Sequence, residues 1–551
     1  MRCITLLFLL ILVTPTIAQS DSTKTSGEIL TGEVIIEKEK KIILPLADKI
    51  FLRSQLKSFD NSPLNLSFDV SEPDFEWPDY KSDVPFQVNN STYPEASYQN
   101  YVKLGYGNFN SPLIEAGLFK SIRNWDNRAI LFYERFKTGP VNGENSGNAD
   151  GGIDVSSTYK KENWVVIPSI SYIGSSYNFY GNANRVNTGF DSSEPDEGNI
   201  NNFKTNIKIG WNNDDVEAYI TPIFTNTAQT ASLSASDNSE SVIGVDAGLE
   251  FKIDDSFTAG LNINGRTSTY KGGLTYDRSL LNINPNLVYK KDALRLDIGF
   301  MVSSSNVNEV SNTSIYPRLK GDYKLSESWS IFGKVEGGIT WNSLNRIITE
   351  NNFLDDSLLI VNTESKLVIG GGLEGNPIEN MFLSISITNS SLNGLPFFIS
   401  SAQDSSKYSL TYDSESVNLF SLNSSISFMP NAVSNYGASL MINSFGLTNL
   451  DRPWHKPAYI LKAYTSHNIK EKLIVSAYFT SMGGIRGPAN VNFGYVKLAP
   501  FIDAGLGAKY LLTPRSSVFI DVNNLLNDEY ERYLGYPIRG LAFKIGGQYR
   551  F

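Results

Sequence analysis

The chain has 551 residues, and its 47 Lys and Arg residues against 57 Asp and Glu residues give a formal net charge of −10. A chain this acidic is a poor partner for nucleic acid, so that class of function is excluded. No run of eighteen apolar residues follows the first eighteen residues, which excludes a transmembrane helix. The 12% aromatic content, the 43 glycines and the mean hydropathy of −0.20 fit a large β protein in which one face of each strand meets water.

Residues 1–18 have the pattern of a secretory signal peptide. Arg2 supplies the positive charge, residues 4–13 form a short apolar run, and Thr16-Ile17-Ala18 is a suitable cleavage site. The only cysteine, Cys3, lies within this segment. The mature chain is therefore expected to have no disulfide, no cysteine-ligated metal and no cysteine nucleophile.

Residues 19–97 differ in composition from everything that follows. A polar stretch rich in Lys and Glu comes first, and an acidic stretch interrupted by Pro73, Pro78 and Pro85 comes next. Proline disfavours regular structure in the residue before it. We therefore interpret residues 19–97 as an extended arm that lies in the periplasm or in the lumen of the domain that follows.

Residues 98–551 consist of long segments in which apolar and polar residues alternate. One clear case sets Ile243, Val245, Ala247, Leu249 and Phe251 against Gly244, Asp246, Gly248 and Glu250. Short turns and long polar loops connect these segments in alternation. The ten short turns begin at residues 124, 160, 212, 253, 290, 325, 376, 430, 469 and 513, and the longest loops include residues 137–152, 181–202, 342–364 and 389–414. This pattern predicts an all-β antiparallel fold of about 22 strands.

Three features favour a transmembrane barrel over a soluble sandwich or propeller. The segments run to about ten residues or more, which is the length that a membrane strand needs. Short turns at one end and long loops at the other are typical of the periplasmic and extracellular ends of an outer-membrane barrel. Four tryptophans lie in or beside the short turns, where an interfacial aromatic girdle is expected: Trp125, Trp164, Trp211 and Trp329.

The last residues, 518–551, contain the most specific motif of the chain. In the final strand Phe543, Ile545 and Tyr549 share one face, and Lys544 and Gln548 share the other. The preceding stretch NNLLNDEYERYLGYPIRG, followed by a strand that ends in Phe551, resembles the carboxy-terminus of TonB-dependent outer-membrane receptors. The matching positions are Asn524, Leu525, Leu526, Asp528, Tyr530, Gly535, Tyr536, Pro537, Arg539, Gly540 and Phe551. The order Pro-Ile-Arg-Gly departs from the usual Pro-Gly-Arg of that family.

The resemblance implies a 22-stranded barrel in the outer membrane of a Gram-negative bacterium, with the final strand as its assembly signal. Receptors of this family carry a plug domain of more than a hundred residues before the first strand, whereas residues 19–97 are too few for one. Energy-coupled import is therefore not implied. Because a barrel of this width encloses a lumen that must be occluded, we expect the arm, assisted by long loops, to fill it, with inward-folded loops or a separate partner chain as the alternatives.

Few residues have the spacing of a catalytic or cofactor site. The glycines of Gly370–Gly375 match a phosphate-binding fingerprint, but a turn and another strand follow them rather than a helix, so we interpret them as strand positions. The chain has two histidines, His455 and His467. His455 with Asp451 is the only pair suited to acid–base catalysis, and a surface position is the simpler interpretation. No enzyme activity, cofactor or transition-metal site is predicted, and the sequence does not identify a ligand-binding residue.

Two loops and one set of charged residues have compositions that suggest specific locations in the barrel. The acidic stretch 191–199 is interpreted as a solvated loop, with calcium binding as the alternative. The stretch 391–400 contains Leu392, Leu395 and Phe397 to Ile399, which is too apolar for a wet loop tip, so it either folds into the barrel mouth or docks a partner or apolar ligand. Alternation places charges of both signs on the lumen face, where they can pair along the wall or anchor the arm: Lys204, Lys208, Asp246, Glu250, Arg295, Asp297, Lys334 and Glu336.

The function predicted from these features is transport across the outer membrane, with the lumen gated by the arm. The alternative is a structural or scaffold subunit of an outer-membrane complex, in which the arm binds a periplasmic protein and the long loops bind a surface protein. In either case outer-membrane lipid surrounds the wall, and the transported ligand is not identified.

Overall fold

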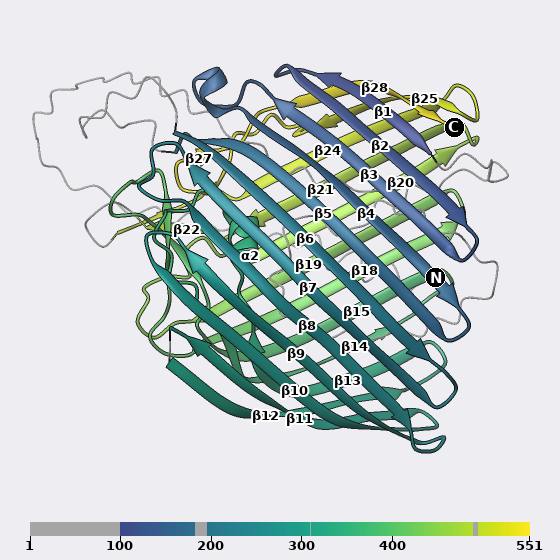
Figure 1. Ribbon diagram of the computed structural model, residues 1–551. Coiled ribbons are helices and arrows are strands. Elements are labelled where there is room, and N and C mark those ends of the chain that lie inside the picture. The colour runs from purple at the N-terminus through teal and green to yellow at the C-terminus, as the bar shows by residue number, and fades with distance from the viewer. Residues whose placement is uncertain (1–99, 182–195, 309, 489–493) are drawn as a thin grey trace, which may run out of the picture. The chain divides into compact units, whose positions relative to one another are not determined.

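The computed structural model describes residues 100–181, 196–308, 310–488 and 494–551. The signal peptide and the arm predicted for residues 1–97 lie outside these ranges. Within the described residues, 22 long strands form one antiparallel sheet that closes on itself, since β1 pairs with both β2 and β28 (Figure 1). The predicted all-β barrel of about 22 strands is confirmed.

The barrel strands follow the chain in order, and each is hydrogen-bonded to the next. They are β1 (Tyr101–Gly107), β2 (Ser111–Ile122), β3 (Trp125–Phe136), β4 (Asn148–Lys161), β5 (Trp164–Phe179), β6 (Asp196–Asn212), β7 (Val216–Ala231), β8 (Asn238–Lys252), β9 (Phe257–Lys271), β10 (Thr275–Lys291), β11 (Leu294–Val307), β12 (Val310–Lys324), β13 (Trp329–Thr340), β14 (Thr363–Gly375), β15 (Met381–Asn393), β18 (Val417–Asn431), β19 (Ser434–Gly446), β20 (Tyr459–Ile469), β21 (Leu473–Gly483), β24 (Phe501–Leu511), β25 (Ser516–Asn523) and β28 (Ala542–Arg550).

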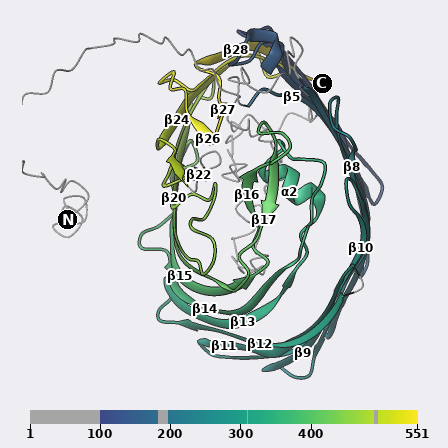
Figure 2. The same ribbon diagram turned by 90° about the vertical axis from the view of Figure 1, so that its left-hand side faces the viewer.

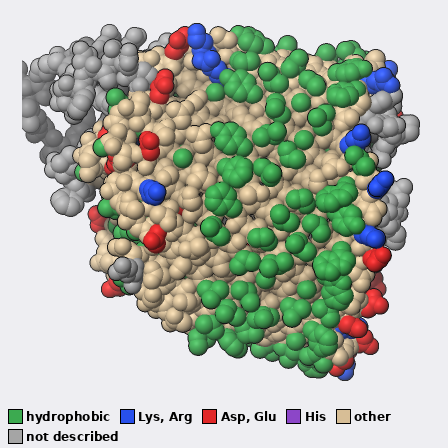
Figure 3. Space-filling model, in the orientation of Figure 1, with side chains coloured by type: hydrophobic (Ala, Val, Ile, Leu, Met, Phe, Trp, Pro, Cys, Tyr) green, Lys and Arg blue, Asp and Glu red, His purple; other side chains and the backbone are tan. Residues whose placement is uncertain are grey.

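The seam between the first and last strands closes the barrel. In its register Tyr101 lies opposite Arg550 and Gly107 lies opposite Lys544. The two faces of β28 differ as the alternation predicts, because Phe543 and Ile545 are 43% and 57% exposed on the outer face while Lys544 on the inner face is buried. Figure 3 shows the same pattern across the wall, where apolar side chains cover the outer face and charged ones gather at its two ends.

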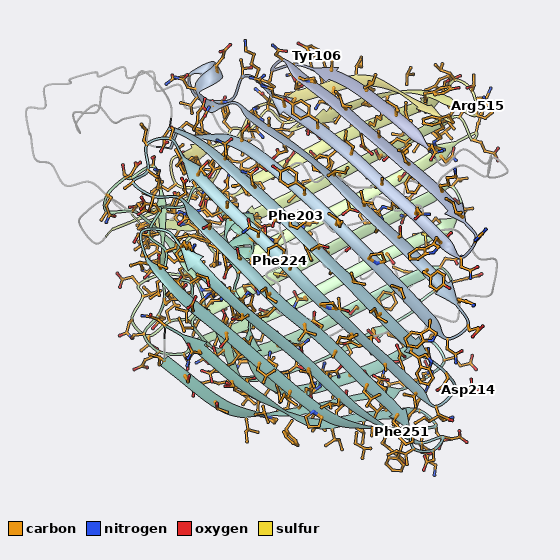
Figure 4. The ribbon with its side chains drawn as sticks, viewed as in Figure 1. Tyr106, Phe203, Asp214, Phe224, Phe251 and Arg515 are labelled. Carbon is orange, nitrogen blue, oxygen red and sulfur yellow. The ribbon has the colours of Figure 1, made fainter. Side chains whose placement is uncertain are left out.

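All ten predicted short turns connect neighbouring strands at one end of the barrel, the right-hand end in Figure 1. Asp214 and Arg515, in two of these turns, lie at that end in Figure 4, whereas Phe203 and Phe224 pack against each other in the middle of the wall with ring centroids 6.2 Å apart. Trp164 and Trp211 lie opposite each other next to their turns. The aromatic girdle is therefore at the level where a membrane interface would be.

The long connections lie at the other end of the barrel, which we call the mouth. They contain the short elements η1 (Gly143–Ser146), α2 (Leu344–Glu350), β16 (Phe397–Ser400), β17 (Tyr408–Thr411), β22 (Arg486–Pro488), β23 (Tyr495–Lys497), β26 (Glu531–Tyr533) and β27 (Tyr536–Pro537). Figure 2, which looks at the mouth, shows α2, β16 and β17 inside the ring of barrel strands. No helix in the described part of the chain has the length and apolar character required to cross a membrane.

Candidate functional site

Four loop segments fold inward at the mouth and pack against one another. We call residues 341–362, 394–416, 447–458 and 524–541 together the lid. Three of these segments share a core with the wall strands, because Tyr177 and Tyr270 of the wall pack with Leu344, Phe398 and Tyr536 of the lid. Trp454 of the segment 447–458 belongs to a second core with Leu395 and Phe397. The long loops therefore form a packed body inside the barrel.

The first lid segment is organised by the helix α2. The Ser343 side chain caps the helix by accepting a hydrogen bond from the Arg346 backbone N–H at 3.1 Å. Leu344, Ile347 and Ile348 repeat at the spacing of one helical face, and all three are buried. The helix therefore turns its apolar face into the lid core.

An ion pair on the wall holds the start of this segment. Arg278 of β10 and Glu240 of β8 form a salt bridge in which their side chains are 0% and 1% exposed. Glu240 Oε2 also accepts the Leu344 backbone N–H at 2.6 Å, and Arg278 Nη1 donates to the Asn342 carbonyl at 2.7 Å. The guanidinium lies over the Trp341 ring, 4.3 Å from its centroid. Both charges of the pair are thus used to fix the lid to the wall.

The second segment is the hairpin of β16 and β17, which pairs Phe397 with Thr411 and Ser400 with Tyr408. Phe397 and Phe398 are fully buried, and so are Leu392 and Leu395 just before them. Of the two alternatives given for the apolar stretch 391–400, folding into the barrel mouth is confirmed. The hairpin supplies apolar side chains to two of the cores inside the mouth.

Aromatic residues join the fourth segment to the others. The rings of Phe353 and Tyr536 stack with centroids 3.6 Å apart, and Tyr180 meets Tyr536 edge to face at 5.0 Å. Tyrosine hydroxyls donate hydrogen bonds to backbone carbonyls of other lid segments. The Tyr408 hydroxyl donates to the Leu534 carbonyl at 2.6 Å, and the Tyr533 hydroxyl donates to the backbone carbonyl of Glu350 at 2.6 Å. Burial raises the pKa of the Tyr180, Tyr408 and Tyr536 hydroxyls well above the usual value, so they remain neutral donors.

His455, predicted to be a surface residue, is fully buried, so that prediction was wrong. Its Nδ1 is 2.9 Å from the Phe398 carbonyl, and its Nε2 accepts the Leu534 backbone N–H at 3.4 Å. This arrangement requires a neutral ring with the proton on Nδ1. Burial, together with the nearby charges of Arg532 and Lys456, lowers the pKa of His455 to about 4, although the hydrogen bond with the Phe398 carbonyl acts in the opposite direction.

The arrangement around His455 does not suit catalysis. Asp451, the acid suggested for a catalytic pair, is exposed, and no hydrogen bond joins it to His455 although the structure describes both residues. Both ring nitrogens instead bond to backbone groups of two other lid segments. His455 therefore connects three segments of the lid.

Two lysines complete the attachments of the lid. Lys456 forms an ion pair with Glu350 at the end of α2, and Lys407 Nζ lies 2.8 Å from Asp196 Oδ2 at the start of β6. Asp196 was predicted to lie in a solvated acidic loop, but residues 196–199 begin β6 and the Asp196 carboxylate is buried. That prediction was wrong for these four residues, and residues 191–195 lie outside the described part of the chain.

The remaining predicted features lie in the wall. Gly370–Gly375 is part of β14 and no helix follows it, as interpreted from the sequence. Four of the lumen-facing charges form ion pairs with neighbours along the wall: Asp246 with Arg266, Asp297 with Arg318, and Lys334 and Lys320 with Glu336. Within the described ranges, no group of three or more His, Cys, Asp and Glu side chains has the geometry of a metal site.

Sequence reasoning missed the residues that anchor the lid. Alternation places Glu240 and Arg278 on the inner face, but they are separated by one strand and 38 residues. Only the register of β8, β9 and β10 shows that they meet. The sequence did signal the apolar members of the lid, because the stretch 391–400 is too hydrophobic for an exposed loop.

Solved structures with this architecture define the class of fold. The FrpB iron transporter of Neisseria meningitidis (F3-3 variant) superposes with a TM-score of 0.66 at 11% identity, over 82% of this chain and 81% of that one. The barrel is thus the 22-stranded fold of TonB-dependent outer-membrane receptors, and the resemblance seen at the carboxy-terminus is confirmed for the wall. Neither the family models nor the curated proteins contain a match to the sequence.

Two further structures have the same fold. The pyoverdine outer-membrane receptor FpvA of Pseudomonas aeruginosa PAO1 matches with a TM-score of 0.63 at 11% identity, over 82% of this chain and 78% of that one. The ferric-catecholate import receptor Fiu of E. coli K12 matches with a TM-score of 0.60 at 9% identity, over 82% and 81%. These similarities establish the architecture of the barrel.

Proposed function

We propose that this protein is a transport barrel of the Gram-negative outer membrane, in which a solute passes through the lumen once the lid has moved. The observation that carries this proposal is the lid itself, a set of loops packed inside the mouth and fixed to the wall by the Glu240–Arg278 pair. A 22-stranded barrel encloses a wide interior, which transporters of this size keep occupied. Loops folded into the mouth are a means of controlling access to that interior.

The named functions of proteins with the same fold support transport. FrpB is described as an iron transporter and Fiu as an import receptor. The lid differs from a simple surface loop, since its contacts with the wall are charged and buried.

We further propose that residues 19–97 gate the lumen from the opposite end. These residues precede β1, which begins at Tyr101 at the short-turn end of the barrel (Figure 1). The lid occupies the mouth, so a second gate would close the lumen at its other end. In this arrangement opening requires both gates to be released.

Conductance of the purified protein in a planar bilayer tests both proposals. Four proteins are compared: the full chain, a deletion of residues 19–94, the lid variant Glu240→Gln, and the lid variant in the deletion background. Asp246→Asn is the matched control, because it removes the same kind of charge from a wall pair with Arg266 that does not touch the lid. We expect the full chain and the control to stay closed and the combined variant to conduct.

Two results would contradict these proposals separately. A combined variant that remains as closed as the full chain would overturn transport through the lumen. Equal conductance of Glu240→Gln with and without residues 19–94 would overturn gating by the arm and leave transport standing. Co-purification of a stoichiometric protein with a barrel that never conducts would instead support a scaffold.

A further inference from the structure

A cavity of about 580 Å³ lies at the mouth beside the lid. The end of β19, the lid segment 447–458 and the strands β22 and β23 border it, and its lining includes Arg452, Lys456, Arg486 and Tyr495. A cavity of this volume is within the range of sites for small organic ligands.

The cavity is basic in a chain that is acidic overall. Three cations line it against a single carboxylate, Asp451, whereas the whole chain carries a net charge of −10. Lys456 is already paired with Glu350. Lys497 lies opposite Arg486 in the β22–β23 register, which adds a further positive charge next to the cavity.

Two of these cations are held close to one aromatic ring. The guanidinium carbons of Arg452 and Arg486 lie 5.0 Å and 5.9 Å from the centroid of the Tyr495 ring. Arg452 Nη1 donates to the Asp451 carbonyl at 2.6 Å, and within the described residues neither guanidinium forms an ion pair with a carboxylate. Two like charges at one ring repel each other, and an anion between them would remove that repulsion.

We propose that this cavity binds a small organic anion that carries carboxylate or phosphate groups. A guanidinium group binds a carboxylate or a phosphate through paired N–H donors. The guanidiniums of Arg452 and Arg486 can offer such donors, because neither is engaged by a carboxylate in the described part of the chain. Phe445, Leu447 and Leu450 line the same cavity and provide an apolar surface for the rest of the ligand. The identification of this anion as the transported solute rests on the transport function proposed above, whereas its binding does not.

Anion binding can be measured directly on the full-length protein in nanodiscs. The probe is pyranine, a fluorescent hydroxypyrene trisulfonate, whose fluorescence anisotropy rises when it binds to the protein. Citrate, pyrophosphate and glucose are then added as competitors at equal ionic strength. We expect displacement by citrate or pyrophosphate, with the stronger of the two identifying the carboxylate or the phosphate as the preferred group, and no displacement by glucose.

Variants locate the site. The double variant Arg452→Gln, Arg486→Gln is expected to weaken probe binding by about tenfold or more, since charge-assisted hydrogen bonds are lost. Lys271→Gln is the matched control, because it removes an exposed charge at the mouth end of β9, outside the cavity lining. Heat-modifiable migration on gels shows that each variant forms a closed barrel.

Two outcomes would overturn the proposed site. One is a double variant whose affinity for the probe is within about twofold of that of the unaltered protein, because the loss of two guanidiniums must weaken binding if they bind the anion. The other is displacement by glucose as effective as that by citrate. A protein that binds the anion but never conducts would retain this site while contradicting transport, so the two proposals fail separately.

Discussion

The Glu240 carboxylate and the Arg278 guanidinium form a salt bridge that solvent does not reach, although both side chains point to the lumen side of the wall. Buried ion pairs are expensive to desolvate, and they persist where further hydrogen bonds satisfy both partners. Here the lid supplies two of these hydrogen bonds, at the Leu344 N–H and the Asn342 carbonyl, and Ser268 of β9 donates another to Glu240. The pair and the start of the lid therefore stabilise each other.

The first prediction concerns this pair. Glu240→Gln leaves the Arg278 charge buried without its carboxylate, and we expect the lid to become less stable by about 3 kcal/mol. The measurement is hydrogen–deuterium exchange of residues 344–360 in nanodiscs, which reports the free energy of local opening. Asp246→Asn, in a pair that is 20% and 24% exposed, should leave the exchange of these residues unchanged. Equal protection in the two variants would show that the pair does not anchor the lid.

The second prediction compares two adjacent leucines. Leu358 is fully buried in the lid core, whereas Leu359 is 48% exposed. Leu358→Ala removes methyl groups from a packed interior, which costs about 2 to 5 kcal/mol of lid stability. Leu359→Ala should cost well under about 1 kcal/mol. The same exchange measurement distinguishes them, and similar losses at both positions would contradict a packed lid.

The third prediction concerns pH. Burial lowers the pKa of His455 to about 4 from 6.5, so the opened lid binds a proton more readily than the closed lid between these values. Lid stability is thus fully present above pH 6.5 and decreases as the pH falls toward 4, by about 3 kcal/mol in total. Exchange of residues 344–360 over this pH range, corrected for the intrinsic exchange rate, measures the slope.

His455→Asn is the control for that slope. It removes the titrating ring, and asparagine tolerates the left-handed backbone at this position, where φ is 58°. At pH 6.5 the lid of this variant should be less stable than that of the unaltered protein, but the stability of the variant's lid should change little between pH 6.5 and 4. A slope equal to that of the unaltered protein would mean that other groups cause the pH dependence.

The fourth prediction concerns the seam of the barrel. A Cβ at Gly546 would lie 2.1 Å from the Leu104 carbonyl oxygen and 2.5 Å from the Phe519 ring, whereas at Gly547 the nearest atom would be 3.6 Å away. Gly546→Ala should therefore force β1 and β28 apart and destabilise the barrel by about 1 to 3 kcal/mol. Gly547→Ala should have little effect. The temperature at which each barrel loses its compact migration on gels measures the difference, and equal temperatures would contradict the packing at the seam.

The wall could be predicted from the sequence because its signals are local. Alternation has a period of two residues, and each short turn contains its own polar residues, so the strand count and the seam with residues 98–109 follow without tertiary information. The lid could not be predicted in this way. Its contacts join residues far apart, such as Tyr180 with the Pro537 carbonyl, and nothing in either loop alone indicates the other.

His455 illustrates the same limit. A histidine between Trp454 and Lys456 in a polar loop has the composition of an exposed site. Its burial depends on Phe398 and Leu534, which belong to two other loops. The arginines of the cavity were missed for a related reason, since Arg452 and Arg486 meet only because both approach Tyr495. Residues 391–400 were the exception, because their hydrophobicity alone indicated an interior position.

The span of these contacts has a consequence for biogenesis. Arg539 hydrogen-bonds to Thr138 across 401 positions of the chain, and Tyr533 to Glu350 across 183. Contacts between residues so far apart in the sequence form late in folding, because the chain must lose the entropy of closing a long loop before the contact can stabilise it. The contact between Arg539 and Thr138 crosses the seam, so it forms only after β1 and β28 have come together. We therefore expect an assembly intermediate in which the strands of the wall are paired and the lid does not yet fill the mouth.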